Sequence, residues 1–403
     1  MQTRKARAKF RAYLTPEQAS FLRGALGACR VVYNDHIYQK ELAREEGRTS
    51  STARDLSAMK TLPETHLWLR DYGSKILQQS KRDAETAYKN FFNSINGKRR
   101  GKKVGKPRYK KKKHGGSIRW NGVSLKTRKV NHKWSEVFLP GHKTWIKFRQ
   151  TIPMDKVSGV TLILEPSGKH YVSFVYDQEI HEAKKDGSVV GIDLGLTDFA
   201  SIVSTSGVRN KVSAPRFLRN VEKKIRRKQR AYSRKEKGSK NQEKSRISLS
   251  REYEKVRFKR QDFYRSLALK LASENQAVVL ESLNVSGLMK NRRVSKSFSD
   301  AGLSSFVNTV KSTCERLGVS LDSVDRFAPT SQVCCVCGVL DGPKPLSVRV
   351  WDCQHCGTVL DRDYNAAVNI LLAAGHAERL NDCGFNVRLL GAVEVEAVTS
   401  VSS

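Results

Sequence analysis

The stretch Val189-Val190-Gly191-Ile192-Asp193-Leu194-Gly195 decides the fold of this chain. It is an apolar run that ends in a single carboxylate, a pattern that favours a buried strand with one polar side chain at its end. Gly191 and Gly195 lie on either side of that carboxylate, and they admit close approach of another part of the backbone. The stretch therefore predicts a central strand that presents Asp193 at a crowded position.

The segments on either side of this strand predict a layered α/β sheet. Residues 198–204 pair back as a second strand, and Ser206-Gly207 is the turn to a third. There follow a long basic helical region at 215–273 broken near Gly238, a strand at 277–281, a helix at 306–317, a strand at 319–324 and a terminal helix from Tyr364. This order is typical of the ribonuclease-H-like fold. We expect such a domain over residues 183–330 and 361–376, with a basic helical insertion at 215–275.

Two further acidic signatures share the pattern of Asp193. Ala277-Val278-Val279-Leu280-Glu281 is a second apolar run ending in one carboxylate, and Asp361-Arg362-Asp363 opens the terminal helix. Isolated carboxylates at the ends of elements can hold two divalent cations about 4 Å apart for phosphodiester cleavage. Mg²⁺ needs few of them, because it keeps several waters. We predict Asp193, Glu281 and Asp363 as catalytic residues and as ligands of two Mg²⁺ ions.

Asp361 competes with Asp363 for the third position. Two residues apart on a helix, their side chains diverge by about 200°, so one of them is expected at the metal. Asp363 is favoured because it is nearer to the helical Asn365-Ala366-Ala367 run. Structural roles are open as well: Asp193 could belong to a sugar-kinase-like ATPase fold, Glu281 could end a surface strand, and Asp361 or Asp363 could be a helix N-cap.

Four cysteines precede the last acidic signature in two pairs, Cys334-x-x-Cys337 and Cys353-x-x-Cys356. Each pair fits one tight turn, and four thiolates can surround one structural Zn²⁺ without leaving a position for water. Cys335 and His355 lie inside the turns, so a ligand swap is the alternative. We predict a zinc-binding region at residues 331–360.

The N-terminal part of the chain predicts a second domain. Lys9 to Leu14 alternates as a strand, Thr15-Pro16 starts a helix through about Glu46, and a second helical stretch runs from Leu67 to Phe92 with an interruption at Gly73. The basic, glycine-rich segment 97–116 is expected to be a mobile arm or a loop ordered by phosphate. Short alternating runs at 117–176 predict antiparallel strands, which form a small barrel that the opening strand completes. The expected domains are 1–14 with 115–182 for the barrel, and 15–114 for the helices.

The charge of the chain indicates a polyanionic partner. Its 403 residues carry 75 Lys and Arg against 39 Asp and Glu, a net charge of +36. Such a charge repels itself unless a polyanion neutralises it. The basic stretches 99–113 and 216–260 are expected to follow nucleic-acid phosphates, although a solvated helix face is the alternative. No apolar membrane span or signal-peptide core is seen, so we expect an intracellular, cytoplasmic protein that joins the nucleoid when bound to DNA.

The residues quoted above resemble those of the TnpB family, the transposon-encoded RNA-guided nucleases from which type V CRISPR effectors appear to derive. Further matching motifs are Cys29-Arg30-Val31-Val32-Tyr33-Asn34, Gly105-Lys106-Pro107-Arg108-Tyr109-Lys110 and Leu280-Glu281-Ser282-Leu283-Asn284. Two departures are minor: Cys335 stands where a serine is common, and Ser282 where an acid is common. Residues 377–403 form a variable tail that matches nothing in the family.

The resemblance implies a fold and an activity. The fold is multidomain, with a RuvC-like nuclease, an inserted zinc ribbon that binds target nucleic acid, and a wedge β-barrel with an inserted helical recognition lobe. The activity is Mg²⁺-dependent cleavage of double-stranded DNA next to a short flanking motif, directed by a guide RNA from the transposon end, by a monomer in the ribonucleoprotein. Asp193, Glu281 and Asp363 match the catalytic triad. Candidate nucleic-acid contacts are Lys75, Gln79, Arg108, Lys110, Arg226 and Arg227.

Two other functions fit parts of the same pattern. The first is a transposase or resolvase of the same fold that works without RNA, which would carry no bound RNA of defined length. The second is a non-catalytic zinc-containing regulator, which would not cleave with Mg²⁺ under any guide. The presence of all three acids favours the nuclease over the regulator.

Overall fold

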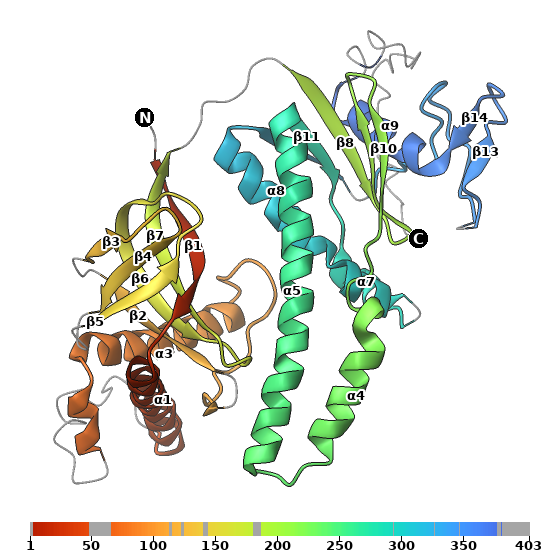
Figure 1. The fold of residues 1–403 in the computed structure, drawn as a ribbon. Coiled ribbons are helices and arrows are strands. Elements are labelled where there is room, and N and C mark those ends of the chain that lie inside the picture. The colour runs from red at the N-terminus through yellow and green to blue at the C-terminus, as the bar shows by residue number, and fades with distance from the viewer. Residues whose placement is uncertain are drawn as a thin grey trace. The chain divides into compact units, whose positions relative to one another are not determined.

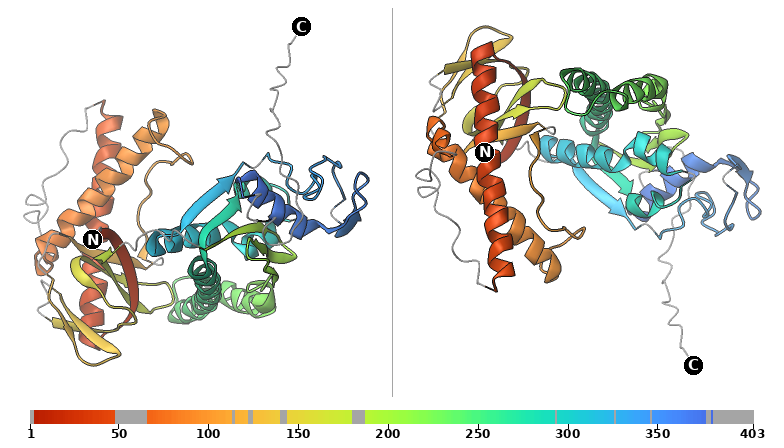
Figure 2. Two further views of the ribbon diagram at one scale, coloured as in Figure 1. Left: turned by 90° about the horizontal axis from the view of Figure 1, so that it is seen from above. Right: turned by 90° about the horizontal axis from the view of Figure 1, so that it is seen from below.

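The computed structural model describes residues 3–47, 66–112, 115–121, 125–139, 144–179, 187–292, 294–325, 327–345, 347–376 and 380. The chain divides into two compact units, whose elements are drawn in Figures 1 and 2. The first comprises Met1–Glu179 and Ala231–Arg251, and the second comprises Ile180–Arg230 and Glu252–Ser403. None of the helices described is both long and apolar enough to cross a membrane. The predicted tail 377–403 lies outside the described residues, apart from Leu380.

An antiparallel sheet of seven strands is the centre of the first unit. Its strands are β1 (Thr3–Tyr13), β2 (Gly116–Asn121), β3 (Thr127–Lys129), β4 (Trp134–Leu139), β5 (Thr144–Arg149), β6 (Asp155–Leu164) and β7 (His170–Glu179). Their order in space is β2-β6-β7-β1-β5-β4-β3, so the opening strand joins the later ones, as predicted. The ladders within the described residues do not join the edge strands β2 and β3, so the structure shows the predicted antiparallel sheet but not the closure of a barrel.

Two helical stretches lie between β1 and β2 in the sequence and share a core with the sheet. α1 (Pro16–Glu45) begins where predicted, because Thr15 and Gln18 form a reciprocal capping box. The second stretch divides at Gly73 into η1 (Leu67–Asp71) and α3 (Ser74–Ile95). The rings of Phe10, Phe148 and Phe174 pack at centroid distances of 5.0 to 6.1 Å in this core.

The basic segment that follows α3 was predicted to be a mobile arm or a phosphate-ordered loop. Its residues Lys106 and Lys110 contact α1. The Asn34 amide donates to the Lys110 carbonyl at 3.2 Å and accepts from the Lys110 N–H at 2.8 Å, and Lys106 pairs with Glu41 at 2.8 Å. Side chains of α1 therefore pair the charge of Lys106 and hold the backbone of Lys110.

The second unit contains a mixed sheet with the predicted element order. Its strands are β8 (Ser188–Leu194), β9 (Asp198–Ser204), β10 (Arg209–Ser213), β11 (Asn275–Glu281) and β12 (Ser320–Val324), arranged as β10-β9-β8-β11-β12. The first three strands are antiparallel, whereas β11 runs parallel to β8 and β12. The strand that begins with Ser188 is therefore the centre of the sheet, as its sequence predicts.

Helices cover both faces of this sheet (Figure 1). On one face, Ile192 of β8 packs with Ala268 and Phe306 of α5 (Lys240–Glu274) and α8 (Leu303–Leu317). On the other face, Val279 of β11 packs with Ile370 of α9 (Arg362–Ala373). Alternate residues of β8 and β11 thus point toward α9, and this face holds the candidate site.

The remaining elements of the second unit are helical insertions and the cysteine-bearing loops. They are η3 (Arg219–Val221), α4 (Glu222–Ser233), α6 (Val285–Leu288), α7 (Ser295–Ala301), β13 (Val350–Asp352) and β14 (Val359–Asp361). Gly238, with a φ of 89°, interrupts the long basic region between α4 and α5, as predicted. The tip of this helical hairpin belongs to the first unit, where Arg246 and Arg251 donate to carbonyls of the turn between β6 and β7 at 3.1 and 3.3 Å.

Candidate active site and metal centre

Asp193 and Glu281 are brought together by parallel strand pairing. Ile192 of β8 is in register with Leu280 of β11, so the next residues on the two strands lie side by side. Ile192 and Leu280 both face α5 and α8, and the residues that follow them therefore both face α9. Two of the three predicted carboxylates thus share one face at the same end of the sheet.

Gly191 allows α9 to lie close to this face. A Cβ atom on Gly191 would be 2.6 Å from the Ala367 carbonyl oxygen and 2.7 Å from Leu371 Cγ, closer than real Cβ contacts. The glycine is therefore required by the approach of the helix, as the sequence reasoning expected. Because α9 crosses the sheet here, its first turn and Asp363 are held near Asp193.

Asp361 and Asp363 have different roles at the start of α9. Asp361 is the N-cap, and its Oδ1 accepts from the backbone N–H groups of Asp363 and Tyr364, both at 3.0 Å. This is the ordinary capping geometry of an aspartate. Asp363 lies inside the first turn and caps nothing. The structure therefore separates the two residues that the sequence left in competition.

The Asp193 carboxyl interacts with the other two acids. Burial, and then the neighbouring carboxylates of Asp363 and Glu281, raise the pKa of Asp193 to about 7, against the opposing effects of Arg362 and a backbone hydrogen bond. Burial also raises the pKa of Glu281. Crowded carboxylates of this kind favour either a proton or a bound cation. Oxygen donors suit Mg²⁺ by their chemistry. Among the described residues, however, the group of acidic, His or Cys side chains whose ligand atoms all lie within 4.8 Å of one another is the four cysteines, and the three carboxylates are not as closely grouped.

Two cations that the sequence reasoning missed border this acidic group. Lys211 of β10 places Nζ 2.8 Å from Asp361 Oδ2 and 3.4 Å from Asp363 Oδ2. Arg349 places Nη1 3.4 Å from Asp363 Oδ1 and donates through Nη2 to Thr197 at 3.1 Å. In a chain with 75 Lys and Arg, no sequence signal distinguishes these two. Against the opposing effect of burial, Lys211 and the backbone N–H groups lower the pKa of Asp361.

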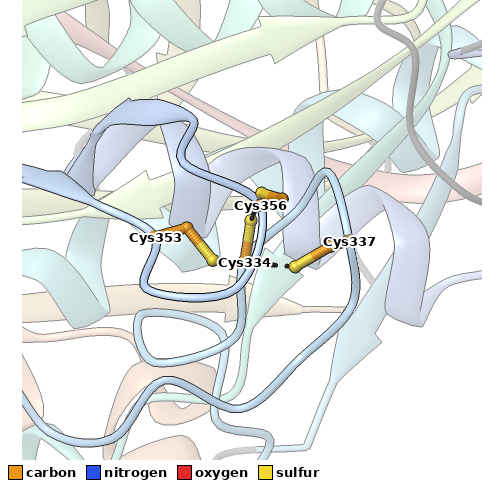
Figure 3. A group of neighbouring side chains, drawn as sticks. All are labelled: Cys334, Cys337, Cys353 and Cys356. Carbon is orange, nitrogen blue, oxygen red and sulfur yellow. Dashed lines mark hydrogen bonds between the residues drawn. The ribbon is translucent and has the colours of Figure 1, made fainter.

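The four predicted cysteines form one cluster (Figure 3). All four Sγ atoms lie within 4.8 Å of one another, with 3.7 Å between Cys334 and Cys356 and 3.6 Å between Cys337 and Cys353. Tetrahedral Zn²⁺ with bonds of about 2.3 Å requires sulfur separations of about 3.8 Å. The cluster can therefore hold one zinc ion, which would fix the two turns to each other.

Neither alternative zinc ligand belongs to this cluster. The Cys335 backbone N–H donates to Asn365 Oδ1 at 2.9 Å, and His355 lies exposed on the second turn. Side-chain and backbone hydrogen bonds involving Thr358 lower the pKa of Cys356 to about 6, which favours the thiolate form that binds metal.

Asn365 and Asn369 connect the cysteine turns to α9, a role that the sequence reasoning did not assign. Both side chains are buried, and both donate to the Val333 carbonyl, at 2.8 and 2.7 Å. Asn369 also donates to the Thr330 carbonyl at 2.8 Å. The helix that carries Asp363 is thereby fastened to the first cysteine turn. A signal was present in the sequence, because the two amides lie one helical turn apart.

The candidate nucleic-acid contacts are divided between the two units. Lys75 is exposed in the first turn of α3, and Gln79 lies one turn later and donates to Asp83 at 2.9 Å. Arg108 and Lys110 line a cavity in the same unit. In the second unit, Arg226 and Arg227 are exposed on α4, where Arg226 pairs with Glu222 at 2.6 Å.

Three family models match parts of the chain. They are described as "Probable transposase" over residues 173–292, "Cas12f1-like, TNB domain" over 304–370 and "Helix-turn-helix domain" over 1–49. The described part of residues 1–49 is a strand, β1, followed by one helix, α1, so it contains no helix-turn-helix.

Curated relatives match nearly the whole chain. A Streptomyces pristinaespiralis protein named "Putative RNA-guided DNA endonuclease" is 33% identical, over 96% of this chain and 93% of the relative. A protein of Escherichia coli (strain K12) with the same description is 30% identical, over 90% of each. A solved structure of a Cas12f1-sgRNA-target DNA complex shares the fold, with a TM-score of 0.51 and 15% identity over 89% of this chain and 83% of that one. The chain belongs to the TnpB family.

Proposed function

We propose that this protein is a transposon-encoded, RNA-guided DNA endonuclease. The observation that supports the proposal most is the parallel pairing of β8 and β11, which puts Asp193 and Glu281 on one face of the mixed sheet. Burial and the carboxylates of Asp363 and Glu281 raise the pKa of Asp193 there. The names of the curated relatives support the RNA-guided activity. The basic composition suits both nucleic-acid partners.

The catalytic chemistry follows from the placement of the side chains. Two bound Mg²⁺ ions would activate a water molecule and neutralise the leaving oxygen of the phosphodiester. Asp193, Glu281 and Asp363 would hold these ions, since the carboxylates of Glu281 and Asp363 both act on Asp193. Asp361 caps α9 and holds Lys211 beside Asp363, which keeps that carboxylate in position before metal binds.

We assign the parts of the family fold to the two units. Residues 183–330 and 361–376 would form the RuvC-like nuclease, and residues 331–360 a zinc-bearing region that contacts the target. The sheet of the first unit would be the wedge domain, and residues 15–114 the recognition lobe. The order of strands in the mixed sheet supports the nuclease assignment.

Recognition of the target would combine base pairing with a short protein-read motif. Guide RNA would pair with one DNA strand, and the protein would read the flanking motif and the backbone. Lys75 and Gln79 share one face of α3 and are the candidates for the motif. We propose that a single copy of the chain acts in the complex.

A cleavage experiment with one matched pair of variants tests the function. The protein is purified with its copurifying RNA, which is sequenced, and is then given a matching DNA target with Mg²⁺. Asp193→Asn should abolish cleavage and leave the bound RNA unchanged, whereas Asp262→Asn, an exposed acid on α5, should cut normally. Cleavage by the Asp193 variant would refute the site. Absence of any RNA of defined length would favour the RNA-independent transposase.

A further inference from the structure

A cavity in the first unit lies where the basic segment crosses α1. It has a volume of about 300 Å³, which is at the lower end of the range for small-molecule sites. Its walls are residues of α1, of the segment around Lys110 and of the start of β2: Leu26, Cys29, Arg30, Arg108, Tyr109, Lys110, Lys111, Gly115, Gly116 and Ser117.

The cavity is built by specific contacts and does not depend on loop packing alone. Asn34 holds the backbone of Lys110 through two hydrogen bonds, and the Tyr109 hydroxyl donates to Glu41. Gly115 and Gly116 let β2 start against α1, because a Cβ on Gly116 would lie 2.8 Å from Leu26 Cδ2. Gly115 has a φ of 74°, which other residues rarely adopt. The wall positions are therefore set before any ligand binds.

Three of the cations that line the cavity have no ion-pair partner among the described residues, while the Asp83 carboxylate acts electrostatically on the fourth, Lys110. Within the described residues, no acidic side chain pairs with Arg30, Arg108 or Lys111. The nearby acids are engaged elsewhere: Glu41 binds Lys106 and Tyr109, and Asp83 accepts from Gln79 and pairs with Arg119 at 3.7 Å. Cationic side chains that line one cavity without ion-pair partners repel one another until an anion binds.

Aromatic and polar groups complete the cavity. The Lys110 ammonium lies 3.7 Å from the centroid of the Tyr33 ring, so a cation–π contact holds it against α1. Tyr109 is 43% exposed and offers part of its ring to a planar ligand. Ser117 adds a hydroxyl at the rim, and burial raises the pKa of the Cys29 thiol to about 12, so Cys29 is an inert part of the floor.

We propose that this cavity binds one nucleotide of a nucleic-acid strand, with the phosphate held by Arg30, Arg108 and Lys111 and the base or sugar against Tyr109. Guanidinium and ammonium groups are the usual phosphate ligands, and stacking on an aromatic ring accepts any base. The inference rests on the proposed function, because the bound nucleotide would belong to a nucleic acid on which the nuclease acts. The nucleotide belongs either to the guide RNA or to the target DNA.

A charge-matched pair of double variants tests this site. Arg30→Gln with Lys111→Gln removes two cations from the cavity, and Arg149→Gln with Lys133→Gln removes two exposed cations that do not line it. Binding of the copurified RNA by the free protein, and of target DNA by the ribonucleoprotein, is measured over a range of salt concentrations. The cavity variant should weaken one of these bindings by about tenfold or more and reduce its salt slope by about 2.

The outcomes distinguish guide RNA from target DNA as the source of the nucleotide, and failure of the nucleotide site from failure of the proposed function. A loss confined to RNA binding assigns the guide, and a loss confined to DNA binding assigns the target. Equal effects of the two double variants overturn the nucleotide site, while wild-type protein that binds no RNA overturns the proposed function instead. If the cavity variant does not fold, acetylation footprinting of the wild-type complex decides: bound nucleic acid should protect Lys111 but not Lys133, and equal labelling refutes the site.

Discussion

At the scale of single residues, the acidic signature Asp361-Arg362-Asp363 combines two functions in carboxylates two positions apart. The Asp361 carboxylate accepts hydrogen bonds from the helix N-terminus and pairs with Lys211. Asp363 makes only longer contacts, at 3.4 Å, with Lys211 and Arg349. A stabilising residue and a candidate metal ligand are thus distinguished by their hydrogen bonds, although they look equivalent in the sequence.

Substitution of each aspartate should therefore affect a different property. Asp361→Ala should lower the free energy of unfolding by about 1 kcal/mol through the lost cap, with a smaller effect on cleavage. Asp363→Asn should abolish cleavage and preserve or raise stability, because it removes a charge that repels Asp193. Thermal melts and DNA cleavage of both variants check this. A cleaving Asp363→Asn protein would contradict the assignment.

The raised pKa of Asp193 predicts a pH dependence of stability without Mg²⁺. Its ordinary value of 3.8 rises to about 7 in the folded protein, so the folded state binds the proton more tightly than the unfolded state. The tighter proton binding stabilises the folded state; this stabilisation is fully present below pH 4 and is lost as the pH rises to about 7. The free energies of unfolding of wild type and Asp193→Asn are measured by denaturation from pH 4 to pH 8. Relative to the variant, wild type should become less stable as the pH rises over that window. A difference that is independent of pH would show that the carboxylate is not perturbed.

At the scale of elements, α9 connects the acidic site to the cysteine cluster. Gly191 permits its approach to β8, Asp361 caps it, and Asn365 and Asn369 tie it to the first cysteine turn. Different residues, most of them within the first turns of α9, therefore set where the helix lies, where it begins and what it is attached to. Displacement of α9 would move Asp363 relative to Asp193.

Loss of one of the two amides that tie α9 to the first cysteine turn should test this connection. Asn365→Ala leaves the buried Cys335 N–H and the Val333 carbonyl without one partner each, which typically costs about 1–3 kcal/mol. We expect a lower melting temperature and weaker zinc retention, measured with a colorimetric chelator. Asn308→Ala, at an exposed position of α8, serves as the control. Unchanged zinc retention in the Asn365 variant would indicate that the cluster holds without the helix.

The predictability of these elements from sequence depended on the range of the interactions involved. The strand at Asp193, the helix start at Thr15 and the cysteine turns follow from local patterns, and the structure contains all three. Asn365, Asn369 and Lys211 act across long sequence separations. The one-turn spacing of the two amides is a local signal, but no local pattern indicates their partners or that of Lys211. The contact of the basic segment with α1 was not predicted for the same reason, since its partner Asn34 lies in a distant helix.

At the scale of the whole molecule, the zinc cluster and the acidic site belong to the same unit, and α1 belongs to the other. Since metal binding contributes to folding free energy, removal of zinc should loosen the loops around the cysteines and the start of α9. Hydrogen exchange after chelation should show faster exchange in residues 331–365 and unchanged protection in α1. Equal acceleration in both units would mean that the metal supports the entire chain.

The central place of β1 in its sheet has a consequence for synthesis on the ribosome. The first strand to emerge pairs along nearly its whole length with β7, which is the last strand of that sheet to be made. Until then the nascent chain can form α1 and α3 but cannot bury the apolar side of β1, because contacts distant in sequence form late. β1 therefore remains largely unpaired until β7 has been synthesised. A chain truncated before β7 would leave that strand exposed to aggregation or to degradation.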